Sequence, residues 1–109
     1  MPTFDAFQQF DIRVGTVLTA VPHPTARKPS LQLTIEFGEA GVKASSAQLT
    51  ARYDPDSLVG RQVICVLNFP PRRIAGFVSE VLVLGAMVSA ADVVLLTPEQ
   101  PVINGLRIA

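Results

Sequence analysis

The sequence predicts an all-β protein, a small five-stranded Greek-key barrel with short helical segments and extensions at both ends. Two stretches, 12–19 and 31–37, alternate with a period of two, as strands with one protected face do. Two others, 63–67 and 81–84, are continuous apolar runs of strand length. The 109 residues have room for one domain, residues 1–109.

Composition narrows the classes of function. Nine Lys and Arg residues balance nine Asp and Glu residues, so no global field draws the chain towards nucleic acid or anionic lipid. Hydrophobic residues make up 49% of the chain, and we expect part of that surface to be buried in a homodimer. The apolar segment 81–91 contains Ser89 and ends at Asp92, which is too short a run for membrane insertion.

Other functions lack the residues that they need. The N-terminus has neither the basic flank nor the apolar core of a secretory signal, so we expect a cytoplasmic protein. Cys65 lies in an apolar run and is interpreted as a buried small hydrophobe, and His23, between two prolines, as a turn residue. One Cys and one His cannot form a structural zinc site, and no phosphate loop or nucleophile elbow occurs. We expect no metal, no cofactor and no enzymatic activity.

The first ten residues carry three phenylalanines. Phe4, Phe7 and Phe10 are spaced by three, which predicts a short helix or a wound arm. Three aromatic rings on a free tail would be a liability. They are therefore expected to cover either a partner subunit or the base of the barrel.

The first strand begins after Asp11. Its two alternating sets are Ile12, Val14, Thr16 and Leu18, and Arg13, Gly15, Val17 and Thr19. This pattern predicts a strand with one protected face, and Gly15 predicts a bulge or a coil where a small barrel closes. A proline-rich loop carrying Arg27 and Lys28 follows.

The next elements form a predicted hairpin and a helical connection. Alternation is cleanest from Leu31 to Phe37, the segment 38–41 turns the chain, and 42–46 returns as the partner strand. The connection 47–60 is predicted to form helical turns, with Pro55 at a helix start and Gly60 at its end. Asp54, directly before Pro55, is interpreted as a cap.

The remaining predicted strands are 62–68, 80–85 and a short one at 93–96. A C-terminal hairpin is predicted around Asn104 and Gly105, between 102–103 and 106–108. Five main strands with a helical connection between the third and fourth favour an OB-fold barrel, and a generic β-sandwich is the alternative.

The stretch 68–86 carries the sharpest functional features. Pro70 and Pro71 cannot donate to a sheet ladder, so the chain should leave the sheet there and present Arg72 and Arg73 on a stiffened loop. Guanidinium groups bind carboxylate or phosphate through paired hydrogen bonds. The alternative is a solvated turn with ordinary surface ion pairs.

Aromatic and polar residues accompany the arginines. Phe69 and Phe77 can stack on a base or receive a partner side chain, and core packing is the alternative, favoured for Phe69. Four polar residues can hydrogen-bond an extended peptide or satisfy turns and strand ends. These are Ser45, Ser46, Gln48 and Asn68.

Several segments in register resemble the tRNA-binding domain family that is appended to aminoacyl-tRNA synthetases. They are Asp11 to Val17, His23-Pro24, Tyr53 to Gly60 and Asn68 to Gly85. The sequence departs from that family at two places, which count against inherited tRNA binding. Thr25 to Pro29 stands where the family has an acidic-basic pair and an apolar residue, and Val81-Leu82 stands where tRNA binders tend to have Gly-Met.

Within this family, the chain is most similar to the free-standing CsaA-type secretion chaperones. The segments that carry this likeness are Ser45 to Gln48, Asn68 to Phe77, Ser79 to Gly85 and Asp92 to Leu96. The resemblance implies an OB-fold homodimer that binds unfolded, pre-secretory polypeptides and assists the Sec translocation machinery without ATP.

Three sets of site residues follow. The peptide-binding set is Ser45, Ser46, Gln48, Asn68, Phe69, Arg72, Arg73, Phe77 and Leu82. An alternative function, a tRNA- or RNA-binding module, would use Arg27, Lys28, Lys43, Arg72, Arg73 and Phe77. The expected dimer contacts are Phe4, Phe7, Phe10, Val102, Ile103, Leu106 and Ile108. A purely structural dimerisation domain is a third hypothesis, which leaves the arginine loop without a purpose.

Overall fold

Five antiparallel strands, in the order β3-β2-β1-β4-β7, form the main sheet of the computed structural model, which describes residues 1–109. These strands are β1 (Ile12–Pro22), β2 (Leu31–Glu36), β3 (Val42–Ala47), β4 (Gln62–Val66) and β7 (Leu82–Val83). The sheet curls until its two edges meet, where the amides of Glu80 and Val81 both donate to the carbonyl of Ala44, at 2.8 and 3.4 Å. The result is a nearly closed barrel, and the predicted all-β OB-fold is confirmed.

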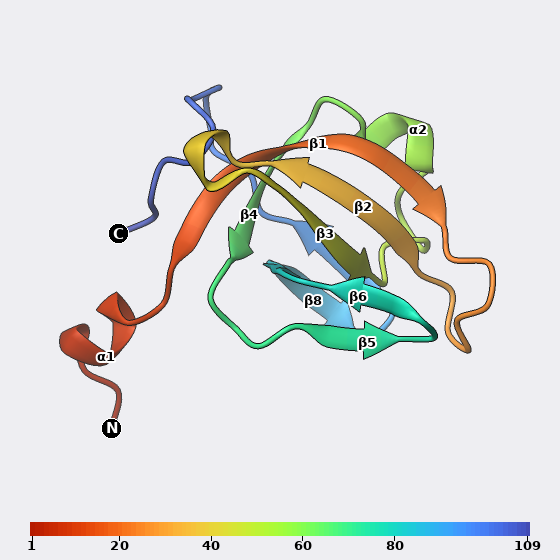
Figure 1. Ribbon diagram of the computed structural model, residues 1–109, viewed down its shortest axis with the longest axis horizontal. Coiled ribbons are helices and arrows are strands. Elements are labelled where there is room, and N and C mark those ends of the chain that lie inside the picture. Colours follow the sequence, from red (N-terminus) through yellow and green to blue (C-terminus); the bar gives the residue numbers. More distant parts are fainter.

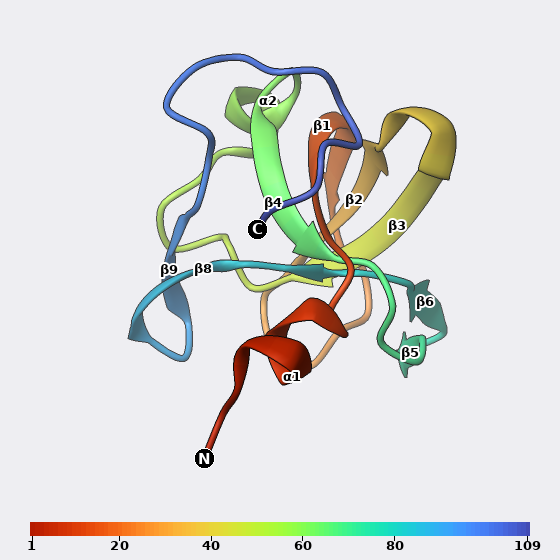
Figure 2. The ribbon, with the colours of Figure 1, turned by 90° about the vertical axis from the view of Figure 1, so that its left-hand side faces the viewer.

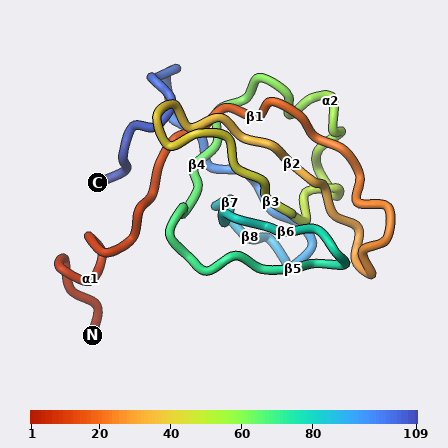
Figure 3. The backbone as a smooth tube through the Cα atoms, viewed as in Figure 1, coloured from red at the N-terminus to blue at the C-terminus, as the bar shows by residue number.

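Two hairpins and three short helical segments surround the barrel (Figure 1). They are β5 (Arg72–Ile74) with β6 (Phe77–Ser79), β8 (Gly85–Ser89) with β9 (Asp92–Leu95), α1 (Phe4–Gln8), α2 (Pro55–Leu58) and a 3-10 turn at Gly38–Ala40. Figure 3 traces the chain from β4 out to β5 and back through β6. No helix is long and apolar enough to cross a membrane.

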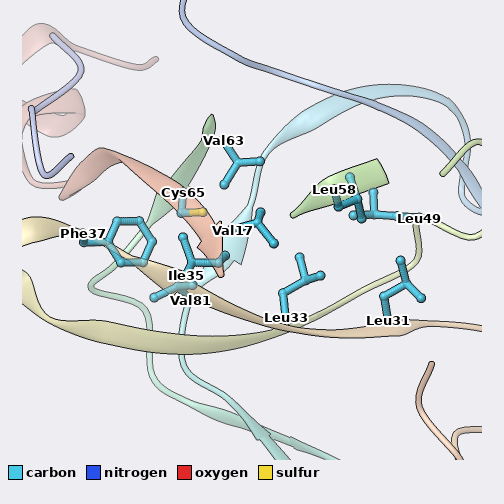
Figure 4. Close-up of a cluster of buried hydrophobic side chains, with 10 residues drawn as sticks. All are labelled: Val17, Leu31, Leu33, Ile35, Phe37, Leu49, Leu58, Val63, Cys65 and Val81. Atoms are coloured by element: carbon cyan, nitrogen blue, oxygen red, sulfur yellow. The ribbon is translucent and has the colours of Figure 1, made fainter. Parts of the chain in front are cut away.

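The core fills the barrel interior (Figure 4). Its ten residues are Val17, Leu31, Leu33, Ile35, Phe37, Leu49, Leu58, Val63, Cys65 and Val81. The alternating face of β2 is fully buried, as its pattern predicted. Cys65 is also buried, and burial raises the pKa of its thiol to about 12, so the thiol stays protonated at neutral pH.

The predicted helical connection is shorter than expected. Only α2 is helical, with Pro55 in its first turn and the carboxylate of Asp54 accepting the amide of Asp56 at 3.2 Å. Leu58 from this single turn is completely buried in the core. The helix therefore contributes to the fold mainly through one side chain.

Strand β1 differs from the prediction of one protected face. Val17 points into the core, whereas Ile12 and Val14 belong to a second buried cluster with Ile64 and Val66 on the outside of the barrel. Both faces of the first half of β1 are therefore covered.

A bulge in β1 explains why the residues after Val17 depart from the predicted alternation between buried and exposed side chains. The bulge in β1 is not at Gly15, because the pairing with β2 shifts between Val17 and Thr19. This extra residue changes which side chains face inwards, so Ala20 packs against the core while Leu18 is exposed.

Only glycine fits at position 15, because core side chains occupy the space that a side chain there would need. A Cβ atom there would lie 2.6 Å from Ile35 Cγ2 and 2.6 Å from Phe37 Cε1. Its absence lets the Phe37 ring pack directly against the backbone of β1.

The C-terminal segment does not form the predicted hairpin. Gly105 and Ile108 donate their amides to the carbonyls of Val14 and Ile12, at 2.7 and 2.8 Å, and the amide of Val14 donates to Leu106 at 3.0 Å. The reason is non-local, since β2 pairs with β1 only from Thr16 onwards and leaves residues 12–15 with a free edge. The C-terminus fills that edge and covers the second cluster.

The predicted strand 80–85 is divided in two. Its centre, β7, pairs with β4, whereas Gly85 begins β8, which pairs with β9. A Cβ at Gly85 would collide with the Val93 side chain of β9, so this glycine lets the two strands approach closely. The short strand predicted at 93–96 is confirmed as β9, one residue earlier in the chain.

The N-terminal phenylalanines do not plug the barrel. Phe4, Phe7 and Phe10 are 69%, 39% and 39% exposed, and the helix predicted from their spacing stands apart from the barrel (Figure 1). Covering the barrel base, one of the two expected roles, is thereby excluded.

Substitution Gly15→Ala should destabilise the protein by about 1–3 kcal/mol, because the added methyl overpacks the barrel against Ile35 and Phe37. Urea unfolding measures the change. In a Phe37→Leu background the same substitution should cost less, since the smaller side chain can yield. An equal cost in both backgrounds would contradict this explanation.

Candidate binding cleft

The two arginines that follow Pro70 and Pro71 lie on a strand, not on a loop as predicted. The chain leaves the sheet at the prolines, then β5 and β6 pair through a two-residue turn at Ala75 and Gly76. Both turn residues have positive φ, 47° and 84°, as a type I′ hairpin requires. Because successive strand residues point to opposite faces, Arg72 and Arg73 are directed to opposite sides of the hairpin.

Arg72 lines a cleft between the hairpin, β3 and the loop 22–30. The cleft has two adjoining parts. The basic half, about 350 Å³, is lined by Ala26, Arg27, Lys28, Ser30, Ser46, Gln48, Arg72 and Ile74. The apolar half, about 250 Å³, is lined by Ser46, Phe69, Pro70, Arg72, Ile74, Ser79, Glu80, Val81 and Leu82. Ser46, Arg72 and Ile74 belong to both halves, so the two form one surface.

His23 holds two walls of the basic half together. Its Nδ1 accepts the amides of Thr25 and Ala26, at 3.2 and 3.1 Å, so the proton of the neutral ring is on Nε2. Nε2 then donates to the carbonyl of Ile74 at 3.0 Å. The residue shapes its own turn, as predicted, and it also fastens the loop 22–30 to β5.

Strand β3 divides its serines between the core and the cleft. Ser45 is 1% exposed and its hydroxyl donates to the carbonyl of Val81 at 2.8 Å. Ser46 points the other way and lines both halves of the cleft, while Gln48 lines the basic half. Of these three predicted site residues, Ser46 and Gln48 are accessible to a bound molecule.

Asn68 is occupied within the subunit. Its Oδ1 accepts the amide of Asp11 at 2.9 Å and its Nδ2 donates to the carbonyl of Gln9 at 2.8 Å. The side chain ties the end of β4 to the segment that precedes β1. It lines neither half of the cleft.

The two flanking phenylalanines have different surroundings. Phe69 is 40% exposed, lines the apolar half and meets the edge of Phe10 with 5.7 Å between ring centroids, so core packing, the favoured alternative, is wrong for this residue. Phe77 is half-buried against the His23 ring, at 6.1 Å, and lines neither half. Leu82 is 47% exposed in the apolar half.

Four of the nine cationic side chains have partners inside the chain. Arg13 and Arg52 pair with Asp11 and Asp92, Arg61 donates to the Ser57 carbonyl, and Arg107 donates to the carbonyls of Gln8 and Phe10. The pairing with Asp92 also raises the pKa of Arg52, chiefly through the hydrogen bond between them.

The other five cations are those of the predicted RNA-binding set. These are Arg27, Lys28, Lys43, Arg72 and Arg73. Only Arg27, Lys28 and Arg72 line the cleft. Lys43 shares a face of β3 with the buried Ser45, and Arg73 lies on the far face of β5, so the five do not form one continuous patch.

A second hollow, of about 300 Å³, lies between Tyr53, Arg61, Gln62 and Leu95. Its polar groups are mostly engaged. The amide of Gln62 bonds to both main-chain groups of Val102, and the Tyr53 hydroxyl accepts the amide of Leu95 at 3.0 Å. We therefore take the cleft at Arg72, with its three unpaired cations, as the candidate site. No three His, Cys, Asp or Glu side chains gather to hold a metal ion.

The residues expected at a dimer interface lie in two places along the C-terminal segment. Phe4 and Phe7 line a hollow with Ile108, whereas Ile103 and Leu106 line another hollow beside Gly38 and Glu39. Arg107 binds the carbonyls of Gln8 and Phe10, which holds the C-terminal segment beside the helix α1 (Figure 2). Most of the expected contact residues are exposed, and Ile103 is 78% exposed. Ile108 differs, because it packs partly against the second cluster.

Comparison with known proteins agrees with this architecture. Two solved structures are a chaperone CsaA from Bacillus anthracis, 51% identical with a TM-score of 0.96, and a CsaA chaperone protein from Picrophilus torridus, 44% identical with a TM-score of 0.91. The alignments cover 100% of this chain and 99% and 100% of theirs.

Curated relatives include the methionine–tRNA ligase of Methanococcoides burtonii, 34% identical over 98 residues, which are 90% of this chain. The chain spans only 14% of that enzyme's length. Residues 12–107 match the family described as "Putative tRNA binding domain". The chain therefore belongs to the tRNA-binding domain family.

Proposed function

We propose that this protein is a homodimeric chaperone that binds unfolded or pre-secretory polypeptides and assists Sec-dependent secretion without ATP. The observation that carries the proposal is the cleft, in which an apolar half and a basic half share Arg72. The 51% identity to a protein described as a chaperone CsaA supports it.

The cleft suits an extended chain because its two halves offer different chemistry side by side. Phe69, Ile74 and Leu82 would receive apolar side chains, each worth roughly 1.5–3 kcal/mol if fully buried. Arg72 would bind carbonyl or carboxylate oxygens, and Ser46 and Gln48 would bond to the guest backbone. A folded protein hides such groups, so accessibility would select the guest.

Association of two copies would increase affinity for long guests. Each copy brings one cleft, and a chain long enough to reach both would be held more tightly than by either alone. The exposed apolar residues of α1 and of the C-terminal segment, above all Phe4, Phe7 and Ile103, are the proposed contacts.

A tRNA- or RNA-binding module is the second candidate. The family description and the curated methionine–tRNA ligases favour it. It ranks below the chaperone because only three of the five unpaired cations share the cleft, and because Phe77 is half-buried rather than presented for stacking.

Arg72→Ala should weaken binding of a fluorescent unfolded peptide about 10- to 100-fold, the size expected for losing hydrogen bonds from a charged group. Arg73→Ala is the matched control and should change affinity little, because it faces away from the cleft. Thermal unfolding should stay the same for both. tRNA titrated against the same preparations across a salt series tests the alternative, which tight, steeply salt-dependent tRNA binding without peptide binding would establish.

Alanine substitutions at the neighbouring Ser45 and Ser46 should affect stability and peptide binding separately. Ser45→Ala leaves the carbonyl of Val81 without its buried donor and should cost about 1–3 kcal/mol in urea unfolding, with peptide affinity nearly unchanged. Ser46→Ala should lower peptide affinity and leave the free energy of unfolding nearly unchanged, because the Ser46 side chain lines the cleft. If both variants lose stability but neither loses affinity, β3 is not a wall of the binding site.

Ile103→Asp should shift the protein from dimer to monomer, because it places a charge in the proposed apolar contact; we expect a loss of dimer affinity on the order of tenfold or more. Sedimentation equilibrium measures this shift. Val21→Asp, at an exposed position at the end of β1 far from the C-terminal segment, is the control. A dimer that tolerates Ile103→Asp would place the interface elsewhere.

A further inference from the structure

We propose that the cleft selects guest segments in which an acidic side chain lies two residues from an apolar one, with the carboxylate seated in the basic half. This inference rests on the proposed function, since it assumes that an extended polypeptide occupies the cleft. It goes further by naming the chemistry of the preferred guest.

The basic half holds a set of positive charges without a counter-charge among its lining residues. Arg27, Lys28 and Arg72 line the basic half, and no Asp or Glu lines it with them. The only ion pairs in the chain are Arg13 with Asp11 and Arg52 with Asp92. Three cations around one hollow repel one another, so an anion brought by a guest would relieve that repulsion.

The basic half also contains a residue whose buried hydroxyl has no partner. Ser30 lines the same hollow and is only 6% exposed, and its Oγ has no hydrogen-bond partner in the chain. Buried polar groups are nearly always bonded, so this unpartnered hydroxyl, which is almost inaccessible in the unbound chain, would gain a partner if it rotated towards a ligand atom in the hollow. A carboxylate is a pure acceptor and can bond the serine hydroxyl and the guanidinium groups together.

The residues that the two halves share indicate the spacing of the guest side chains. The basic and apolar halves share Arg72, Ser46 and Ile74, so their occupants must be close neighbours. In an extended chain, residues i and i+2 point to the same side about 7 Å apart. The one carboxylate of the apolar half, Glu80, already accepts the amide of Ala44 at 3.0 Å. An acid and an apolar residue separated by one position therefore fit the two halves.

These features favour a peptide carboxylate over an RNA phosphate. A phosphate could satisfy the cations and a base could stack on Phe69, but the aliphatic groups of Ile74 and Leu82 in the apolar half suit a peptide side chain better than a base. The same geometry disfavours guest segments rich in Lys and Arg, whose charges would face Arg27 and Lys28.

The test uses four unstructured peptides that differ at two positions only, carrying Asp-x-Leu, Asn-x-Leu, Lys-x-Leu or Asp-x-Ser. We expect the Asp-x-Leu peptide to bind at least tenfold more tightly than the Asn-x-Leu and Asp-x-Ser peptides, and the Lys-x-Leu peptide to bind most weakly. Equal affinities, with binding still lost in Arg72→Ala, would overturn the inference and leave the proposed function intact. Absence of peptide binding altogether would overturn both.

Three protein variants extend the peptide comparison. Lys28→Ala should abolish most of the preference for Asp over Asn, whereas Lys43→Ala, the same charge change outside the cleft, should leave it unchanged. Ser30→Ala removes the orphan hydroxyl, so it should lower affinity for the Asp-x-Leu peptide without lowering the unfolding temperature. Inorganic phosphate and tRNA serve as competitors. Tight tRNA binding that depends on Lys28, without discrimination among peptides, would assign the basic half to RNA instead.

Discussion

The packing of β2 against the bare backbone of Gly15 is the constraint on which the barrel depends. Ile35 and Phe37 occupy the space that any side chain at this position would need, and this contact draws the centre of the sheet together. The sheet can then curl far enough for the carbonyl of Ala44 to meet the amides of Glu80 and Val81. The cleft lies just outside that closure, so its walls are placed by the core beneath them.

Strand β3 shows how the fold and the site share one segment. Ser45 turns inwards and bonds Val81 across the closure, while Ser46, the next residue, turns outwards into the cleft. The hairpin β5–β6 applies the same alternation to Arg72 and Arg73. Function therefore depends on strand parity as much as on residue type.

The sequence was most informative where local pattern and tertiary contact agree. The alternation from Leu31 to Phe37 predicted the buried face of β2, and the two prolines marked where the chain leaves the sheet. Alanine in a turn position that usually takes Asn, Asp or Gly concealed the short hairpin and hence the separation of the two arginines.

The features that the sequence did not predict depend on contacts between segments that lie far apart in the chain. The free edge of β1, which attracts the C-terminus, exists only because β2 ends its pairing at Thr16. Likewise, the sequence around Ser30 does not indicate that its hydroxyl lacks a hydrogen-bond partner, and the sequence around Asn68 does not indicate that its side-chain amide is already bonded. Both depend on which distant residues lie close in the fold. The Phe69 ring is exposed for a similar reason, since the chain has already left the sheet when it is reached.

The imidazole of His23 has a wider consequence. It is the one side chain that bonds the loop 22–30 to the hairpin, so two walls of the basic half, at Ala26 and Ile74, are joined through a single ring. The barrel core lies elsewhere and does not use that ring. A substitution at this one position would therefore loosen the join between two walls of the cleft, while the barrel core, which makes no use of the ring, would keep its resistance to unfolding.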